Sequence, residues 1–154
     1  MKINIGEKHK PFIIAEMSGN HNGSLSNAIK IVKAAAKTGV NAIKLQTYTA
    51  DTMTLNSNKK EFLINDKKSI WKGSTLYNLY DKAHTPWKWH KKIFSVAKAN
   101  GLICFSTPFD DTAVKFLEKN FNPPLYKISS FENTDLRLIK IVARTKKPMI
   151  ISLG

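Results

Sequence analysis

Two short apolar segments constrain the fold of this chain most, because each ends abruptly in polar, chemically capable side chains. The first is IIAEMSGNHNG at residues 13–23, and the second is AIKLQTYTADTMTL at residues 42–55. Between them, residues 25–38 carry apolar side chains at helical spacing, which predicts a helix with one apolar face. The chain therefore opens with a β-α-β unit whose polar residues follow the strand ends.

The rest of the sequence continues the alternation of strand and helix. The predicted strands are residues 12–16, 42–46, 102–106, 125–129 and 149–152. The predicted helices are residues 25–38, 87–100, 111–120 and 136–145, with a short helix at 75–82 inside a long irregular insert, 49–86. Gly39 and Gly101 end two of these helices, as glycine caps do. Strict β-α order predicts a parallel sheet.

The strand count indicates part of a larger architecture. A closed (β/α)8 TIM barrel needs eight strands and typically about 250 residues, whereas this chain has 154 residues and five predicted strands. We predict an α/β fold in which residues 1–154 form the N-terminal five-strand portion of an incomplete TIM barrel. The alternative is an open, doubly wound sheet that is complete in itself.

The charge of the chain suggests an anionic ligand but not nucleic acid. The formal net charge is +14, yet of 25 basic residues only Arg137 and Arg144 are arginine. Nucleic-acid readers rely on arginine for bidentate contacts. The scattered lysines predict solvated helix faces or an anionic small-molecule site, and no nucleic-acid partner.

Three further features of the sequence indicate the cellular compartment of the protein. No run of residues is long and apolar enough to span a membrane, and the N-terminal residues lack the apolar core of a secretory signal. We expect a cytoplasmic protein with no membrane contact. The single cysteine, Cys104, lies in the apolar run LICFS, which favours a buried strand residue over a nucleophile.

Charged residues in the predicted strands indicate a binding site. Glu16 ends an apolar strand, where a carboxylate is costly unless it is paired or bound. Lys44 stands between Ile43 and Leu45, which face the other way, so its ammonium group should point into the barrel. Lys127 repeats this arrangement in LYKISSFE. Two inward ammonium groups form a plausible cradle for a substrate that carries phosphate and carboxylate.

Further polar residues gather at the strand ends. They are Gln46, Thr47, Ser106, Thr107, Ser129, Ser130 and Ser152. Their side chains could bind phosphate oxygens or cap the following helices. Glu132 follows the fourth strand as Glu16 ends the first, which gives two carboxylates suited to proton transfer. The loop residues Asn20, His21 and Asn22 could contact substrate or shape the loop, and both interpretations stay open.

Six segments together resemble a known family. They are AEMSGNHNGS, AIKLQTYTADTMTL, WKGSTLYNLYDKAHTPWKWH, CFSTPFD, YKISSFE and KPMIISLG. In this order and spacing they resemble the nonulosonic acid synthases, the sialic acid synthase family, over essentially the whole chain. The insert, QTYTADTMTL and SSFE are most similar to the pseudaminic acid branch. The N-acetylneuraminate and legionaminate branches are the alternatives.

The resemblance implies a phosphoenolpyruvate-dependent condensation with a diacetamido-trideoxyhexose. The product is a nine-carbon nonulosonic acid, and phosphate is released. The positions that match the family's phosphoenolpyruvate site are Lys44, Thr107, Lys127, Ser130 and Ser152. Glu16 and Glu132 match its catalytic carboxylates, and Gln46 and Asn20 match further substrate-binding positions.

The resemblance also implies a cofactor and protein partners. In the family a divalent metal, Mn²⁺ or Mg²⁺, polarises the sugar aldehyde. Its histidine ligands lie on later barrel strands, outside these 154 residues, as does a C-terminal antifreeze-like domain that takes part in a homodimer. We therefore expect the chain to need a complementary C-terminal half and to be inactive without it. The other functional hypotheses are a different barrel enzyme that uses phosphoenolpyruvate, such as a keto-acid aldolase, and a non-catalytic remnant.

Overall fold

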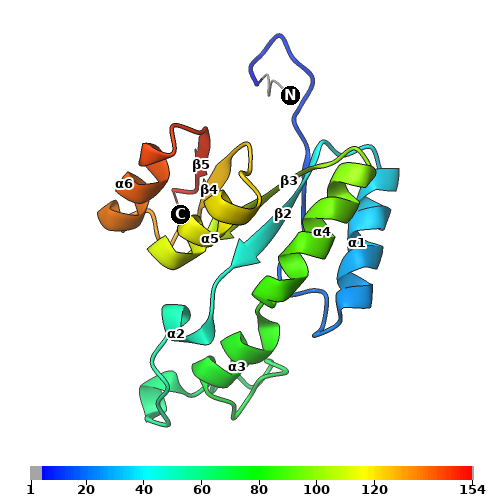
Figure 1. The fold of residues 1–154 in the computed structure, drawn as a ribbon. Coiled ribbons are helices and arrows are strands. Elements are labelled where there is room, and N and C mark those ends of the chain that lie inside the picture. The colour runs from blue at the N-terminus through cyan, green and yellow to red at the C-terminus, as the bar shows by residue number, and fades with distance from the viewer. Residues whose placement is uncertain (1–4, 154) are drawn as a thin grey trace.

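The computed structural model describes residues 5–153 (Figure 1). Residues 1–4 and 154, which the predicted domain includes, lie outside the described residues. The strands are β1 (Ile14–Glu16), β2 (Ala42–Thr47), β3 (Ile103–Pro108), β4 (Tyr126–Ile128) and β5 (Met149–Ile151). The helices are α1 (Leu25–Lys37), α2 (Ala50–Met53), the 3₁₀ helix η1 (Lys60–Phe62), α3 (Leu76–Ala83), α4 (Trp87–Ala99), α5 (Asp111–Asn120) and α6 (Leu136–Arg144).

The five strands form one parallel sheet in the order β1-β2-β3-β4-β5. Each strand pairs with its neighbour in the sequence, as in a barrel, and the order never reverses as it does in a doubly wound sheet. Helices α1 and α4 lie side by side over β2 and β3 (Figure 1). The predicted five-strand portion of a barrel is confirmed, and the doubly wound alternative is wrong.

Alternation along the strands separates two apolar layers. Ile43, Leu45 and Cys104 face the helices and pack in one buried cluster with side chains of α1 and α4. Phe105 and Leu125 belong to a second cluster, which also contains Ala42, Ile103 and, less buried, Phe12, Ile14 and Ile150. That second cluster is the inner layer of the half-barrel. Polar residues of the same strands continue this layer toward the carboxyl ends.

Local capping explains where the helices begin and end. The side chain of Ser24 accepts a hydrogen bond from the Asn27 amide at the start of α1, and that of Asp110 accepts one from the Ala113 amide at the start of α5. Gly39 follows α1 with φ +79° and Gly101 follows α4 with φ +76°. Glycine adopts this left-handed conformation without strain, which confirms the two predicted helix stops.

The strand bounds differ slightly from the predicted ones. β1 begins at Ile14 rather than at residue 12: the Ile13 carbonyl oxygen still accepts from the Ala42 amide at 3.2 Å, but the Ile13 amide donates to the side chain of Asn41 at 2.7 Å. β3 runs on to Pro108, two residues beyond its predicted end. The β2–β3 pairing is correspondingly long and brings Gln46 opposite Thr107.

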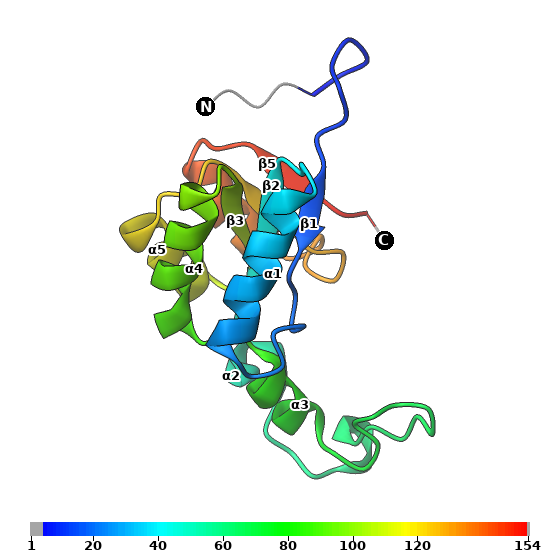
Figure 2. The same cartoon turned by 90° about the vertical axis from the view of Figure 1, so that its right-hand side faces the viewer.

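The insert between β2 and α4 is more ordered than predicted. α3 confirms the expected short helix, but α2 and η1 were not predicted, because single turns carry too few residues to show a periodic pattern. A bridge between Leu63 and Thr75 ties the far end of the insert together. The insert extends from the carboxyl end of β2, away from the N-terminal segment (Figure 2).

The β5 edge of the sheet and the segments beside it carry exposed apolar side chains. Leu153 and Ile151 at β5, Phe131 after β4 and Leu136 at the start of α6 are all solvent-exposed. Such an edge suits pairing with a further strand. Among the described residues, no helix has both the length and the apolar character needed to cross a bilayer.

Candidate active site at the carboxyl ends of the strands

Lys44 lies at the centre of a polar group on the inner face of the sheet. Its side chain is only 7% exposed. The Nζ atom lies 3.2 Å from Glu16 Oε2 and 3.3 Å from Thr107 Oγ1. The parallel register explains this arrangement, because it sets Glu16 of β1 beside Lys44 of β2, and Thr107 lies two residues further along β3 than the register partner of Lys44. Three strands thus contribute one residue each.

Lys127 forms a second polar group on the neighbouring strands. Its ammonium group donates to Ser152 Oγ at 2.5 Å and to the Ile128 carbonyl oxygen at 2.6 Å. The side-chain amide of Asn133 donates to the backbone oxygen of Ser152 at 3.4 Å, which supports that residue from the β4–α6 loop. Sequence reasoning missed Asn133, although it directly follows the SSFE motif.

The two groups are close enough to act on each other electrostatically. Burial lowers the pKa of Lys127, and the positive charge of Lys44 lowers it further. The carboxylates of Glu16 and Glu132 oppose that change and raise the pKa of the same ammonium group. Two cations and two carboxylates thus lie near enough at this mouth for their charges to influence one another.

This arrangement suits an anion with two charged ends. Lys44, Thr107, Lys127 and Ser152, here called the anion cradle, supply two ammonium groups and two hydroxyl groups on one face of the sheet. Ammonium and hydroxyl donors bind phosphate and carboxylate oxygens. Glu16 is half-exposed beside Lys44, where its carboxylate can accept a proton from a bound molecule.

The other predicted site residues lie around this cradle with fewer contacts. Gln46 lies opposite Thr107 on the inner face. The hydroxyl of Ser129 donates to Glu132, so that carboxylate is held by the loop that follows β4. Ser130 lies half-buried in the same loop. Asn20 is exposed in the β1–α1 loop, where only its backbone amide bonds, to the Met17 carbonyl, among the contacts of the described residues.

The prediction that Thr47 and Ser106 join the cradle is wrong. Both residues alternate with inward neighbours and so face the helices. Thr47 Oγ1 lies 2.7 Å from Ser106 Oγ and 2.9 Å from His90 Nε2 of α4, and all three side chains are fully buried. Their hydroxyls bind each other and the imidazole instead of a ligand, and none of them caps a helix.

The loop residue His21 has a structural role. It is fully buried, its Nδ1 atom accepts from the Gly23 amide, and its Nε2 atom lies 3.2 Å from Thr85 Oγ1 in the insert. Burial lowers its pKa, with a smaller contribution from His84. The ring of Trp89 meets the His21 ring edge-on at 5.4 Å. His21 therefore shapes the β1–α1 loop, and its buried ring is not placed to contact a substrate.

Trp87, the first residue of α4, is a packing residue. Trp87 donates from Nε1 to the Tyr48 carbonyl oxygen at 3.1 Å, and its ring lies 4.6 Å from that of Phe116. These contacts fix the end of the insert to β2 and α5.

The thiol of Cys104 is buried in β3, which confirms the prediction of a buried strand residue. Burial raises the pKa of this thiol and so disfavours the nucleophilic thiolate.

The described residues do not by themselves fit a metal centre. No three histidine, cysteine, aspartate or glutamate side chains of residues 5–153 gather closely enough to hold an ion. Glu16 is paired with Lys44, and Glu132 accepts from Ser129. Mn²⁺ and Mg²⁺ bind through oxygen and imidazole ligands, and the two carboxylates at this mouth already have partners. A metal bound at this mouth would therefore need ligands from outside residues 5–153.

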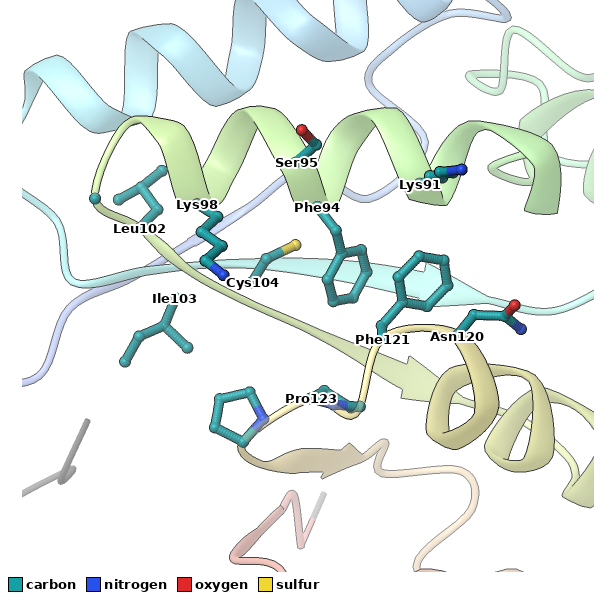
Figure 3. A pocket seen from close by; sticks show the side chains of 12 residues that line it. Lys91, Phe94, Ser95, Lys98, Leu102, Ile103, Cys104, Asn120, Phe121 and Pro123 are labelled. Atoms are coloured by element: carbon teal, nitrogen blue, oxygen red, sulfur yellow. The ribbon is translucent and has the colours of Figure 1, made fainter.

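A large cavity lies elsewhere in the molecule. It measures about 600 Å³ and opens between α4 and the α5–β4 connection, beside the start of β3 (Figure 3). The rings of Phe94 and Phe121 stack at 4.4 Å over it, and Cys104 and Pro123 line its sides. Its lining is mostly apolar and lacks the converging polar groups of a catalytic site. The cradle, not this cavity, is the candidate site.

The chain is similar to curated sugar-acid synthases over nearly its whole length. The chain is 50% identical to a pseudaminic acid synthase of Campylobacter jejuni over 98% of its own length and 43% of that protein. It is 34% identical to an N,N′-diacetyllegionaminic acid synthase of Legionella pneumophila over 93% of its length and 39% of that protein. The chain thus spans less than half the length of these curated relatives.

A solved structure shows the same architecture. The N-acetylneuraminic acid synthetase of Leptospira borgpetersenii, crystallised with citrate, superposes with a TM-score of 0.80 at 25% identity. The match covers all of this chain and 50% of that one, and it corresponds to the N-terminal part of the barrel. Residues 31–154 match the NeuB family. Because this match covers most of its length, the chain belongs to the NeuB family.

Proposed function

We propose that this chain supplies the phosphoenolpyruvate-binding half of a pseudaminic acid synthase. The observation that carries the proposal is the convergence of Lys44 and Lys127, each with a hydroxyl partner, beside Glu16 at the carboxyl ends of parallel strands. In a barrel this end of the sheet is where active sites are built. The 50% identity to a pseudaminic acid synthase favours that branch over the more distant legionaminic acid synthases.

The anion cradle explains the first half of the reaction. Lys44 and Lys127 hold the phosphate and carboxylate of phosphoenolpyruvate, and Thr107 and Ser152 donate from their hydroxyls. The methylene carbon (C3) of phosphoenolpyruvate then attacks the aldehyde carbon of the diacetamido-trideoxyhexose, and the aldehyde oxygen takes a proton and becomes a hydroxyl. Water adds to C2, the carbon that carries the phosphate, and loses a proton. The bond between C2 and the phosphate oxygen breaks, which releases phosphate and leaves a nine-carbon 2-keto acid.

The carboxylates and the outer loops are assigned to the sugar side. Glu16 lies beside Lys44 and can take a proton from water or a sugar hydroxyl. Glu132, Ser130, Gln46 and Asn20 surround the same mouth and contact the sugar or the enolpyruvate carboxylate in this proposal. The reaction runs in the cytoplasm.

The remaining parts of the site come from outside residues 1–154 in this proposal. A complementary C-terminal half closes the barrel on the exposed β5 edge and brings the ligands for Mn²⁺ or Mg²⁺, which activates the sugar aldehyde. The assembled enzyme is a homodimer. We therefore expect this chain alone to have no synthase activity.

A complementation assay tests the proposal. The chain is incubated with Mn²⁺, phosphoenolpyruvate and 2,4-diacetamido-2,4,6-trideoxy-L-altrose, with and without the separately produced C-terminal part of the Campylobacter jejuni relative. We expect phosphate release only with both parts, and none with Lys127→Ala in the chain. Release by the chain alone above the level of Lys127→Ala would refute the need for a second half. Release with other amino sugars but not this one would assign another branch.

A further inference from the structure

His90 occupies an unusual place for a polar side chain. It lies on the face of α4 that also buries Ile93 and Ala97, and it is fully buried. The rings of Phe94, Phe116 and Phe121 surround it, with centroids 5.4–6.4 Å away. A polar group in such surroundings is costly unless each of its hydrogen-bonding atoms has a partner.

The contacts of His90 define a chain of hydrogen bonds. Its Nδ1 atom lies 3.4 Å from the Pro86 carbonyl oxygen, which can only accept, so Nδ1 carries the proton. The Nε2 atom therefore accepts from the Thr47 hydroxyl at 2.9 Å, and Thr47 Oγ1 accepts from Ser106 at 2.7 Å. Burial keeps the ring neutral by lowering its pKa to about 4. All side-chain hydrogen-bonding atoms in this chain of bonds are satisfied.

This chain of bonds ends next to the anion cradle. Thr47 follows Gln46, and Ser106 precedes Thr107, while Gln46 and Thr107 are register partners on the inner face. Thr107 is the residue whose hydroxyl meets Lys44 Nζ at 3.3 Å. A shift of β2 against β3 would therefore move Lys44 and Thr107 apart, and the buried hydroxyls on the other face oppose such a shift.

We propose that His90 is a positioning residue for the anion cradle. Through Thr47 and Ser106 it fixes the carboxyl ends of β2 and β3, and so it holds Thr107 against Lys44. The importance of this role for catalysis rests on the proposed function, but the positioning itself is a property of the fold. Removal of the imidazole leaves the Thr47 hydroxyl without its acceptor and frees the two strand ends to shift.

Three variants separate positioning from packing. His90→Leu fills the space but lacks the acceptor, whereas His90→Gln places an amide near the position of Nε2. Phe94→Leu is the matched control, because it disturbs the same aromatic surroundings and leaves all the hydrogen bonds in place. A purely structural role would make His90→Leu and Phe94→Leu behave alike at the cradle.

The first measurement is nuclear magnetic resonance of the full chain labelled with ¹³C-lysine, with the Lys44 side-chain signal assigned by Lys44→Arg. We expect His90→Leu to shift the Lys44 signal, His90→Gln to restore most of it, and Phe94→Leu to leave it unchanged. An unchanged Lys44 signal in folded His90→Leu, or an equal shift in Phe94→Leu, would overturn the proposal. This readout requires no ligand.

The second measurement is the affinity for phosphoenolpyruvate, determined by calorimetry on the same proteins. We expect about tenfold weaker binding in His90→Leu, a loss typical of a displaced charged hydrogen-bond donor. His90→Gln should recover most of that loss. A wild-type chain that binds no phosphoenolpyruvate would refute the proposed function, while the lysine signal still decides whether His90 positions the cradle.

Discussion

Single buried side chains link the helices of this protein to its candidate active site. His90 of α4 reaches the outer face of β2 and β3 through Thr47 and Ser106, directly behind inward residues of the anion cradle. Such a contact orients the hydrogen-bond donors of the cradle before a ligand arrives, which lowers the entropy cost of ligand binding. A neutral imidazole is required, because its Nε2 atom has to accept from Thr47.

The low pKa of His90 makes stability depend on pH in a defined direction. The folded pKa is about 4 and the usual value is 6.5, so between these values the unfolded state binds the extra proton and the folded state does not. His90 therefore stabilises the fold least at the acidic end of this window. We expect its contribution to the free energy of unfolding to fall by about 2 kcal/mol from about pH 7.5 to about pH 5.

Urea unfolding of the wild type and of His90→Phe at several pH values checks this expectation. The pH slope should be shallower in the variant, with a remainder from His21, whose pKa is also lowered. Equal slopes in the two proteins would mean that His90 does not titrate as its burial requires.

Residue types and alternation in the sequence were sufficient to predict much of the site. Lys44 and Lys127 are flanked by apolar residues that face the other way, so their inward direction followed from strand periodicity. The hydroxyls of Thr47 and Ser106 were assigned to the wrong face, because strand alternation places them on the same side as Leu45 and Cys104, which face the helices. His90 was missed because its partner Thr47 is 43 residues away, and no local pattern reveals that contact.

At the scale of elements, the insert is fixed to the barrel by a small number of specific contacts. The His21–Thr85 bond joins the β1–α1 loop to the end of the insert, two residues before α4, and Trp87 joins α4 to Tyr48, which directly follows β2. Gly19 also approaches α3 closely, since a Cβ atom there would lie 3.1 Å from the Ala83 carbonyl oxygen. The loops around the mouth of the half-barrel thus support one another.

Substitution of Thr85 tests this joint. Thr85→Val keeps the shape but leaves the buried Nε2 proton of His21 without an acceptor, because Nδ1 already accepts from Gly23. We expect a loss of about 1–3 kcal/mol in the free energy of unfolding. Thr85→Ser retains the hydroxyl and should lose markedly less. A loss in Thr85→Ser as large as that in Thr85→Val, measured by thermal or urea unfolding, would contradict this expectation, because Ser keeps the bond and loses only the methyl group.

At the scale of the whole molecule, the half-barrel is well packed on its helix side, and among the described residues its two edge strands, β1 and β5, each pair with one strand only. The alternating strand and helix pattern was enough to predict the strand order and the parallel sheet, since each β-α unit repeats the same connection. The short turns of the insert were beyond such reasoning, because they depend on contacts with distant segments rather than on periodicity. The exposed apolar residues at β5 lie where a next barrel strand would pair.

The central claim is that this half-barrel carries a specific site for an anion with two charged ends, a phosphate and a carboxylate. It is tested most directly by calorimetric titration of the full chain with phosphoenolpyruvate. Lys127→Met removes a cradle lysine, and Lys92→Met removes the same charge from an exposed position on α4. We predict saturable one-to-one binding that weakens at least about tenfold in Lys127→Met and is unchanged in Lys92→Met. Equal weakening in both variants, or no saturable binding by the wild-type chain, would contradict the account.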